Sequence, residues 1–321
     1  MSLLLWLLFS LLGLIVVVAI WFGIDTKHAY TRISGNSAFM SSPLGDIEFK
    51  RGGTGVPVLV IHGSGGGYDQ GELIAKTILG DDFAWIAPSR FGYLRSTFRK
   101  GATFDDQAEA YVYLLDHLGL KKVTVLALSH GGPSALLFAA RYPEHVSSLT
   151  LLSCGVASSS EASQAAANKK GDALTTVFKF EILYWVVRKF LRKKLMRLMG
   201  VSDTVITSLT AEQHTLVHRV IDYMAPVFPR YAGVAFDNKA AMPNERVAKI
   251  RVPTLIVHAT DDKLQLYHNA EYAAANIPGA RLVSFARGGH LLLAVEQAVV
   301  QEEVRRFILT HAGRSERGTS R

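Results

Sequence analysis

The sequence contains a single cysteine, Cys154, among its 321 residues. One cysteine can form neither an intramolecular disulfide bond nor a multi-cysteine zinc site, so disulfide-rich scaffolds and cysteine-based zinc domains are excluded. Charged residues make up only 19% of the chain and hydrophobic residues 49%, which excludes intrinsic disorder. The ordinary counts of glycine (27) and proline (10) exclude collagen-like and low-complexity chains. The length therefore allows one large globular domain or two small ones, with a substantial core.

Long apolar runs are also scarce, and only one is long enough to span a membrane. Residues Leu3–Ile24 form 22 positions without a charged side chain, and a bilayer core of about 30 Å needs roughly 20 helical residues. A secretory signal has a shorter apolar core and a small-residue cleavage site. We therefore predict an uncleaved anchor at residues 1–26, in preference to a cleaved signal or a buried core helix. Lys27 and Arg32 follow the run, and the positive-inside rule then favours a cytoplasmic location for the rest of the chain.

Six short apolar runs follow the anchor. Continuous apolar runs of this length are typical of strands buried on both faces of a parallel sheet. Helical patterns separate several of them, for example at residues 104–118 and 133–142. This alternation predicts an α/β fold with a mainly parallel, doubly wound sheet. The expected strands lie at residues 56–61, 83–87, 123–128, 149–152, 254–257 and 280–285.

One long segment breaks the alternation of strands and helices. Residues 157–249 begin with a Ser/Ala-rich stretch, contain no convincing buried strand and show helical patterns. A helical insertion at this point would cover the carboxyl ends of the strands, where open α/β sheets bind ligands. We therefore predict a helical cap at 157–249, a core formed by 45–156 and 250–311, and a basic tail at 312–321.

The net charge of +8 is concentrated in two segments. Residues 179–197 carry +6 and the last eight residues carry +2, so the rest of the chain is balanced. No nucleic-acid-binding motif accompanies these segments, and we expect no nucleic-acid partner. Six apolar residues at 182–187 lie within the basic segment. Two interpretations stay open: the segment binds an anionic membrane surface, or it is a cap helix that is half buried and half solvated.

The strongest local motif is the heptapeptide LALSHGG at residues 126–132. It follows a predicted strand and precedes a helical pattern, which is the context of a nucleophile elbow. The sharp turn requires small flanking residues, and Ala127 and Gly131 meet that requirement. Ser129 is then the candidate nucleophile at a helix N-terminus, where free N–H groups stabilise negative charge. The alternative is an ordinary Gly-rich turn that happens to contain a serine.

A glycine-rich loop, HGSGGG at residues 62–67, follows the first of the expected strands. Stabilising an oxyanion requires two backbone N–H groups aimed at the developing charge. We assign these to His130, which follows the candidate nucleophile, and to Ser64 in the loop. A phosphate-binding loop is the alternative, but the G-x-G-x-x-G spacing is missing and no Walker lysine follows.

Polar residues after two later strands complete the order Ser, Asp, His. HATDD follows the strand expected at 254–257, and RGGH follows the next expected strand. We predict that His290 exchanges a proton with Ser129, and that Asp261 or Asp262 orients its imidazole. A loop histidine without a catalytic role is the alternative for His290, because the chain has eleven histidines.

Taken together, these motifs resemble those of the α/β-hydrolase superfamily, in the branch with a serine nucleophile and a cap. The resemblance covers residues 45–311 and implies Asp262 as the acid, since the family's Gly-x-x-Asp motif aligns with ATDD. Residues 87–96 resemble the family's Asp-x-Arg-Gly-x-Gly-x-Ser loop, with Ser89 at the aspartate position. Ala127 stands where the elbow usually has glycine.

The resemblance does not by itself fix the reaction, because the superfamily catalyses many reactions and includes non-enzymes. A serine nucleophile favours acyl transfer to water and argues against the dehalogenase and epoxide-hydrolase branches, which generally use aspartate. We expect a serine hydrolase, carboxylesterase or lipase-like, that cleaves a small-molecule ester or related acyl bond through an acyl-enzyme without cofactor or metal. The alternatives are C–C bond hydrolysis or cofactor-free peroxidation by the same triad, and a non-catalytic binding module.

Three large side chains close to these motifs have two interpretations. Tyr68, Arg90 and Tyr93 either line the ligand crevice or pack the loops that surround it. Large side chains on loops serve both purposes in α/β proteins, so the sequence leaves both interpretations open.

Overall fold

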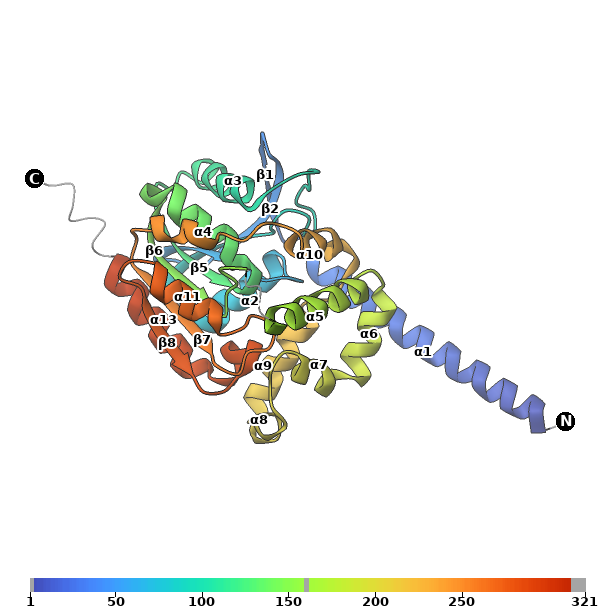
Figure 1. Cartoon of the computed structure of the whole chain (residues 1–321). Helices are drawn as coiled ribbons and strands as arrows, with labels where there is room; N and C mark the ends of the chain where they lie inside the picture. The colour runs from blue at the N-terminus through green and yellow to red at the C-terminus, as the bar shows by residue number, and fades with distance from the viewer. Residues whose placement is uncertain (1–2, 159–161, 313–321) are drawn as a thin grey trace, which may run out of the picture.

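An eight-stranded sheet forms the centre of the protein (Figure 1). The computed structural model describes residues 3–158 and 162–312. The strand order is β1-β2-β4-β3-β5-β6-β7-β8; β1 and β2, and β2 and β4, pair antiparallel, and the other neighbours pair parallel. The predicted mainly parallel α/β sheet is confirmed. The strands are β1 Ala38–Ser42, β2 Gly45–Gly52, β3 Val56–Ile61, β4 Phe83–Pro88, β5 Val123–Leu128, β6 Val146–Leu152, β7 Thr254–Ala259 and β8 Arg281–Phe285.

Helices cover this sheet. Further helices lie outside it: one long helix at the N-terminus, and a group inserted between β6 and β7. The helices of the described residues are α1 Leu3–Ile33, α2 Tyr68–Ile78, α3 Phe104–His117, α4 Gly132–Arg141, α5 Ala162–Phe178, α6 Glu181–Phe190, α7 Arg192–Leu198, α8 Asp203–Ser208, α9 Ala211–Asp222, α10 Tyr231–Asp237, α11 His268–Asn276, α12 Leu292–Val295 and α13 Gln297–Ala312. Both helices expected from the sequence, α3 and α4, are present.

Side chains of the central strands alternate between two cores. On β3, Leu59 and Ile61 belong to the core that includes α3, α4 and α11, whereas Val58 and Val60 belong to the core that includes α2 and α13. Burial on both faces explains why the strands are continuous apolar runs in the sequence. Helices on both faces make the sheet doubly wound, as predicted.

The hairpin of β1 and β2 is missing from the sequence prediction, which found six strands. β1 lies at the edge of the sheet and has one buried residue, Met40, among its five. An antiparallel edge strand keeps one face in solvent, so it does not show the continuous apolar run of a parallel strand. The six expected strands are present, with boundaries that differ by at most three residues.

Helix α1 projects from the body of the protein (Figure 1). Its apolar side chains are exposed, and Ala29 near its carboxyl end is its one buried residue. Within the described part of the chain it is the one helix long and apolar enough to cross a bilayer, and a secretory signal sequence shares these properties. The helix continues to Ile33, beyond the predicted end of the anchor at residue 26.

Helices α5 to α10 form the insertion between β6 and β7. The described residues between 157 and 249 contain no strand. In Figure 1, α5, α6, α7 and α9 lie between the sheet and α1. The division into core, cap and tail stays a prediction, and residues 313–321 of the predicted tail lie outside the described residues.

Candidate active site

Ser129 lies directly after β5, in the 3-10 turn Ser129–Gly131 that leads into α4. Its φ of +53° is in the left-handed region, which non-glycine residues rarely adopt and which clusters at functional sites. A Cβ at Gly131 would lie 2.7 Å from the backbone oxygens of Ile61 and His62, so this close approach requires glycine. The sequence therefore forms a tight strand–turn–helix corner with Ser129 at its apex.

His290 approaches Ser129 from the loop after β8. Its Nε2 lies 2.9 Å from Ser129 Oγ, and its Nδ1 lies 2.8 Å from Asp262 Oδ2. Ser129 and Asp262 are buried, whereas His290 is partly exposed. The structure thus brings the three residues into one hydrogen-bonded chain, although 161 residues separate Ser129 from His290.

The environment of Asp262 keeps its carboxyl group ionised. Asp262 Oδ1 accepts hydrogen bonds of 2.8 and 3.0 Å from two backbone N–H groups of the following turn. Burial raises the pKa of Asp262, but the charge of His290 and hydrogen bonds from His258 and His290 outweigh burial and bring the pKa to about 2. An ionised Asp262 accepts the Nδ1–H of His290, so that Nε2 is free to accept the proton of Ser129.

Asp261, the other candidate acid, contacts the backbone and not the imidazole. Its Oδ1 accepts a hydrogen bond of 2.8 Å from the N–H of Gly289, which precedes His290. His258, which the sequence analysis did not single out, lies 3.5 Å from Asp262 through its Nε2. Its place four residues before Asp262 was the available signal. Asp261 therefore supports the loop that carries His290, and His258 supports the position of Asp262.

The glycine-rich loop lies beside the strained corner. A Cβ at Gly63 would lie 2.9 Å from the Cβ of Ser129, so the loop can approach this closely only with glycine there. Ser64 and His130 line the same cavity as Ser129. The His130 imidazole is 3.0 Å from Gln265 Nε2 through its Nδ1, and burial lowers the pKa of His130. The assignment of the Ser64 and His130 N–H groups as an oxyanion hole stays a prediction.

A buried ion pair joins the loops around the site to α10. Arg90 makes two hydrogen bonds of 2.7 Å to Asp237, and Tyr93 donates a hydrogen bond to the same carboxylate. The Arg90 N–H also donates to His62 Nε2, and burial with the nearby charge of Arg90 holds the pKa of His62 well below its ordinary value. Arg90, Tyr93 and Tyr68 are buried and do not line the cavity, in line with the loop-packing interpretation.

The insertion also contacts His290 through backbone atoms. The His290 N–H donates a hydrogen bond of 2.7 Å to the carbonyl oxygen of Met199, just after α7. A Cβ at Gly200 would lie 2.6 Å from the carbonyl oxygen of Asp261, so the turn after α7 packs tightly on the loop that carries the acid. No spacing in the sequence indicated this contact, because it joins backbone atoms of distant segments.

Comparison with known proteins identifies the fold family. Residues 56–183 match the family described as alpha/beta hydrolase fold. The solved structure of an alpha/beta hydrolase fold protein from Nakamurella multipartita is 26% identical, covers 86% of this chain and 99% of its own, and gives a TM-score of 0.65. The chain belongs to the α/β-hydrolase superfamily.

Two relatives of this α/β-hydrolase are similar over different lengths. The uncharacterized hydrolase YcgS of Bacillus subtilis (strain 168) is 39% identical over 109 residues, which is 34% of this chain and 38% of that protein. The 2-hydroxymuconate semialdehyde hydrolase of Pseudomonas putida is 26% identical over 252 residues, which is 74% of this chain and 82% of that protein. The names of both relatives agree with a hydrolase.

The hydrolase has a cavity of about 420 Å³ that reaches Ser129 and His290. The described residues that line it include no lysine or arginine. Exposed polar side chains of Asn168, Asp172 and Asn238 lie on its solvent side. Apolar side chains of the insertion form much of its wall, namely Leu174, Phe178, Leu195, Met199, Val220, Met224, Val234 and Met242, with Tyr184. The cavity therefore fits a substrate with an apolar part.

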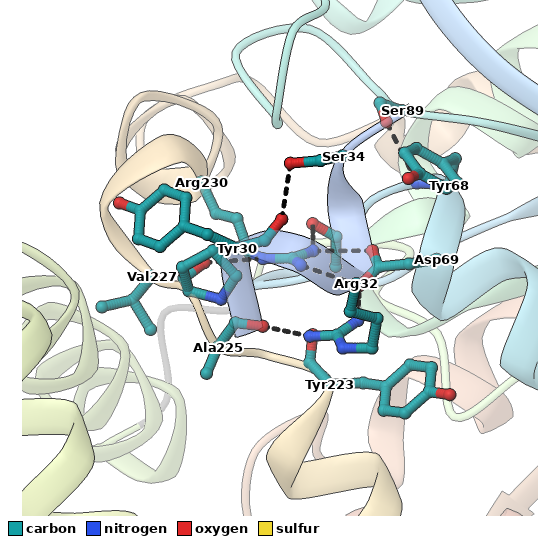
Figure 2. A network of polar contacts seen from close by, with 12 residues as sticks. Tyr30, Arg32, Ser34, Tyr68, Asp69, Ser89, Tyr223, Ala225, Val227 and Arg230 are labelled. Carbon is teal, nitrogen blue, oxygen red and sulfur yellow. Dashed lines mark hydrogen bonds and ion pairs between the residues drawn. The ribbon is translucent and has the colours of Figure 1, made fainter. Parts of the chain in front are cut away.

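The carboxyl end of α1 is tied to the glycine-rich loop of the hydrolase. Figure 2 shows Asp69 of α2 between Arg230 of the insertion and Arg32 of α1. Arg230 makes hydrogen bonds of 3.0 and 2.8 Å to Asp69 and one of 2.6 Å to the Gly66 carbonyl oxygen. Arg32 donates to Asp69 and to the Ala225 carbonyl oxygen. Burial raises the pKa of Asp69, but the two arginines lower it overall. One charge network thus joins α1, the loop and the insertion.

The close approach of Gly63 to Ser129 leads to a first prediction. Gly63→Ala adds a Cβ that would lie 2.9 Å from the Ser129 Cβ, so the corner or the loop must shift. A displacement of about 1 Å at a catalytic group can lower the rate by about 100-fold. We expect kcat for a short-chain ester to fall by about that factor. Gly23→Ala, with no atom within 4 Å of the new Cβ, is the control. An unchanged kcat in Gly63→Ala would refute the tight contact.

Proposed function

We propose that this α/β-hydrolase is a serine hydrolase that cleaves a carboxylic ester, or a related acyl bond, through an acyl-enzyme on Ser129. The observation that carries the proposal is the hydrogen-bonded chain from Ser129 Oγ through His290 to Asp262, with distances of 2.9 and 2.8 Å. A hydroxyl, a base within hydrogen-bond reach and a third group that orients the base are what nucleophilic acyl transfer requires.

In the acylation step, Ser129 Oγ attacks the acyl carbon while His290 Nε2 takes the hydroxyl proton. Negative charge develops on the acyl oxygen, and we assign its stabilisation to the N–H groups of Ser64 and His130. The tetrahedral intermediate then loses the alcohol oxygen, which receives the proton from His290. Asp262 remains ionised and stabilises the imidazolium. The products of this step are the free alcohol and an acyl group bonded to Ser129.

In the deacylation step, a water molecule attacks the acyl carbon and His290 takes its proton. The second tetrahedral intermediate breaks the bond to Ser129 Oγ, which regains its proton from His290. The carboxylic acid leaves and the starting state is restored. His290 thus acts as base and then as acid in each half of the reaction. Its Nε2 takes up and releases a proton twice per turnover, while its Nδ1 stays hydrogen-bonded to Asp262.

The cavity wall favours an ester with an apolar acyl group over C–C bond hydrolysis, which uses the same triad. The relative from Pseudomonas putida is named for 2-hydroxymuconate semialdehyde. A muconate semialdehyde carries a carboxylate, and burying an anion requires a cationic or hydrogen-bonding partner. Amide side chains of the described lining can hydrogen-bond a carboxylate, but no lysine or arginine there offsets its charge, and the acids Asp172 and Asp237 repel it. The ester is therefore our first candidate, and C–C hydrolysis is the second.

We also propose that α1 anchors the hydrolase as a single span, with the catalytic domain on the cytoplasmic side. Its exposed apolar length supports a span, and Lys27 at its carboxyl end supports this orientation. A removable signal sequence has no need for contacts with the mature fold. α1 instead continues without a break to Ile33, and Trp21, which lies within the apolar run, meets Trp185 of α6 edge to face at 5.1 Å. This integration supports an anchor that is retained.

A panel of esters with increasing acyl length tests this proposal. The full chain is assayed in detergent micelles with p-nitrophenyl esters, and with 2-hydroxymuconate semialdehyde as the C–C substrate. Each additional buried CH₂ contributes about 0.8 kcal/mol, which is about fourfold in kcat/KM. We expect kcat/KM to rise from acetate to hexanoate by this increment per carbon. Faster turnover of the semialdehyde than of every ester would favour the second candidate.

A further inference from the structure

We propose that the exposed face of α6 lies in the interface of the same membrane leaflet from which α1 emerges. The inference rests on the proposed anchor and adds a second membrane contact, formed by the insertion that roofs the cavity. The partner is the boundary between lipid headgroups and acyl chains. Figure 1 shows α6 beside the point where α1 leaves the body of the protein.

Exposed apolar side chains gather on α6. Apart from α1, the described residues include eleven large apolar side chains that are exposed; six of them lie on α6 or directly flank it, and a seventh, Phe228, lies beside its first turn. Ile182, Leu183, Val186 and Phe190 are spaced as one helical face, and Phe190 is 58% exposed. The other three are Phe180, Leu191 and Phe228, whose N–H donates to Glu181 Oε1 in the first turn of α6. A contiguous patch of apolar side chains that is exposed to solvent marks an interaction site.

The opposite face of α6 is already occupied by protein. Tyr184 donates a hydrogen bond of 2.7 Å to the Ile221 carbonyl oxygen, and Trp185 is buried. Arg188 on this face contacts Asp25 and Asp222 at 3.2 and 3.4 Å. α6 is therefore apolar on its free face and packed on the other.

Contacts between α1 and α6 hold this face at the level where the uncharged part of α1 ends. The Trp21 and Trp185 rings meet edge to face at 5.1 Å. Trp185 Nε1 donates a hydrogen bond of 3.0 Å to Asp25, the first charged residue after the apolar run. Tryptophan and the first charged side chain mark the membrane–water boundary of a span. Since α6 is fixed to these residues, its free apolar face lies at that boundary.

The charges of the basic segment agree with an interfacial contact driven mainly by apolar side chains. Four of its seven basic residues pair with acids: Arg188, Lys189, Arg192 and Arg197 contact Asp25, Asp222 or Asp203. Lys193 and Lys194 are exposed, and no ion pair to them occurs among the described residues. The segment is thus not a strongly cationic patch. The apolar face provides most of the binding, and these two lysines add a modest preference for anionic lipid.

This location of α6 has a consequence for substrate entry. The cavity wall includes Tyr184 of α6, Leu195 of α7 and Met199, which directly follows α7. These two helices therefore separate the proposed catalytic serine from the membrane interface. Met199 also accepts the hydrogen bond from the N–H of His290. A substrate dissolved in the bilayer would therefore reach the enzyme next to its cavity wall. Esters that partition into lipid become the favoured substrate class.

Fluorescence quenching in nanodiscs tests the proposed contact. Cys154 is buried and burial raises the pKa of its thiol, so a cysteine introduced on the surface can be labelled selectively. The full chain carries an environment-sensitive fluorophore at Ile182→Cys or Val186→Cys. Leu309→Cys on α13, which is also exposed, is the control because α13 lies far from α1 (Figure 1). The nanodiscs contain phosphatidylcholine, phosphatidylglycerol and a nitroxide-labelled lipid.

We expect the nitroxide lipid to quench the label at 182 and 186 and to leave the label at 309 unchanged. Equal quenching at all three positions would overturn the proposal, and so would failure of the chain to insert. A blue-shifted label at 182 that lipid does not quench would also overturn it, because the face would then be covered by a second protein copy. None of these readouts uses catalysis, so the contact can fail while hydrolase activity persists, or the reverse.

A double substitution tests whether the same membrane contact speeds the hydrolysis of esters dispersed in vesicles. Ile182→Asp with Val186→Asp adds charge to the free face, and neither residue lines the cavity. We expect unchanged hydrolysis of a water-soluble ester and roughly tenfold slower hydrolysis of an ester dispersed in anionic vesicles. Ile182→Ala with Val186→Ala should have a smaller effect. Equal rates of wild type and the aspartate variant on the vesicle substrate would contradict the interfacial contact.

Discussion

Ser129→Ala is expected to lower kcat for short-chain esters by about 10⁵-fold or more. Removing Oγ removes the atom that we propose forms the acyl-enzyme, and it also leaves His290 Nε2 without its partner at 2.9 Å. Residual hydrolysis would come from the oxyanion-stabilising groups and substrate binding alone. The measurement is the steady-state hydrolysis of a p-nitrophenyl ester by the full chain in detergent. Folding of the variant is checked by circular dichroism.

Ser153→Ala is a matched control for this substitution. Ser153 is also a buried serine with a positive φ, +48°, directly after a strand, but its Oγ has no hydrogen-bond partner among the described residues. Its loss should change the esterase rate little. If Ser129→Ala kept a wild-type rate, or if Ser153→Ala lost as much activity as Ser129→Ala, Ser129 would not be the nucleophile.

Asp262→Asn is expected to lower kcat by about 10⁴-fold, with a smaller effect on KM. The amide can donate a hydrogen bond to His290 Nδ1, which stabilises the tautomer with the proton on Nε2. In that tautomer the Nε2–H of His290 points at Ser129, so Nε2 cannot accept the proton of the Ser129 hydroxyl. The Asp262 carboxylate has a pKa of about 2 and is ionised throughout the neutral range, so the substitution removes a full negative charge beside His290.

Asp261→Asn separates the role of the acid from a general effect on the loop. Asp261 precedes Asp262 and accepts the Gly289 N–H at 2.8 Å, a hydrogen bond that the Oδ1 of asparagine can also accept. We expect this variant to keep most of the wild-type kcat. Similar losses in the two variants would mean that Asp262 acts through loop structure and not through His290. The comparison is made on kcat and KM for one ester at one pH.

The sheet and the order of the candidate catalytic residues were predictable because both depend on local patterns. Six strands were visible as apolar runs since parallel strands are buried on both faces. The hairpin at Ala38–Gly52 was not visible, because its edge strand keeps one face in solvent. The site motifs directly follow strands, and parallel strands end at one edge of a sheet, which brings Ser129 near His290.

Contacts between distant segments with no common motif could not be predicted. The Arg90–Asp237 ion pair joins residues 147 apart, and neither position had a pattern that indicated the other. The same holds for Asp25, which pairs with Arg188 and Lys189 of the basic segment although more than 160 residues separate it from them. The choice between Asp261 and Asp262 depended on the family motif, because both follow the same strand and only side-chain direction separates them.

Labelling with a fluorophosphonate, followed by mass spectrometry, tests the central claim most directly. The reagent phosphonylates a serine only where a base activates it and the site stabilises the developing oxyanion. The full chain is labelled in detergent, digested, and the modified residue is located by fragmentation. The account predicts one phosphonyl group, on Ser129, and no label after Ser129→Ala. A folded, unlabelled wild-type chain, or a label on another serine, would contradict it.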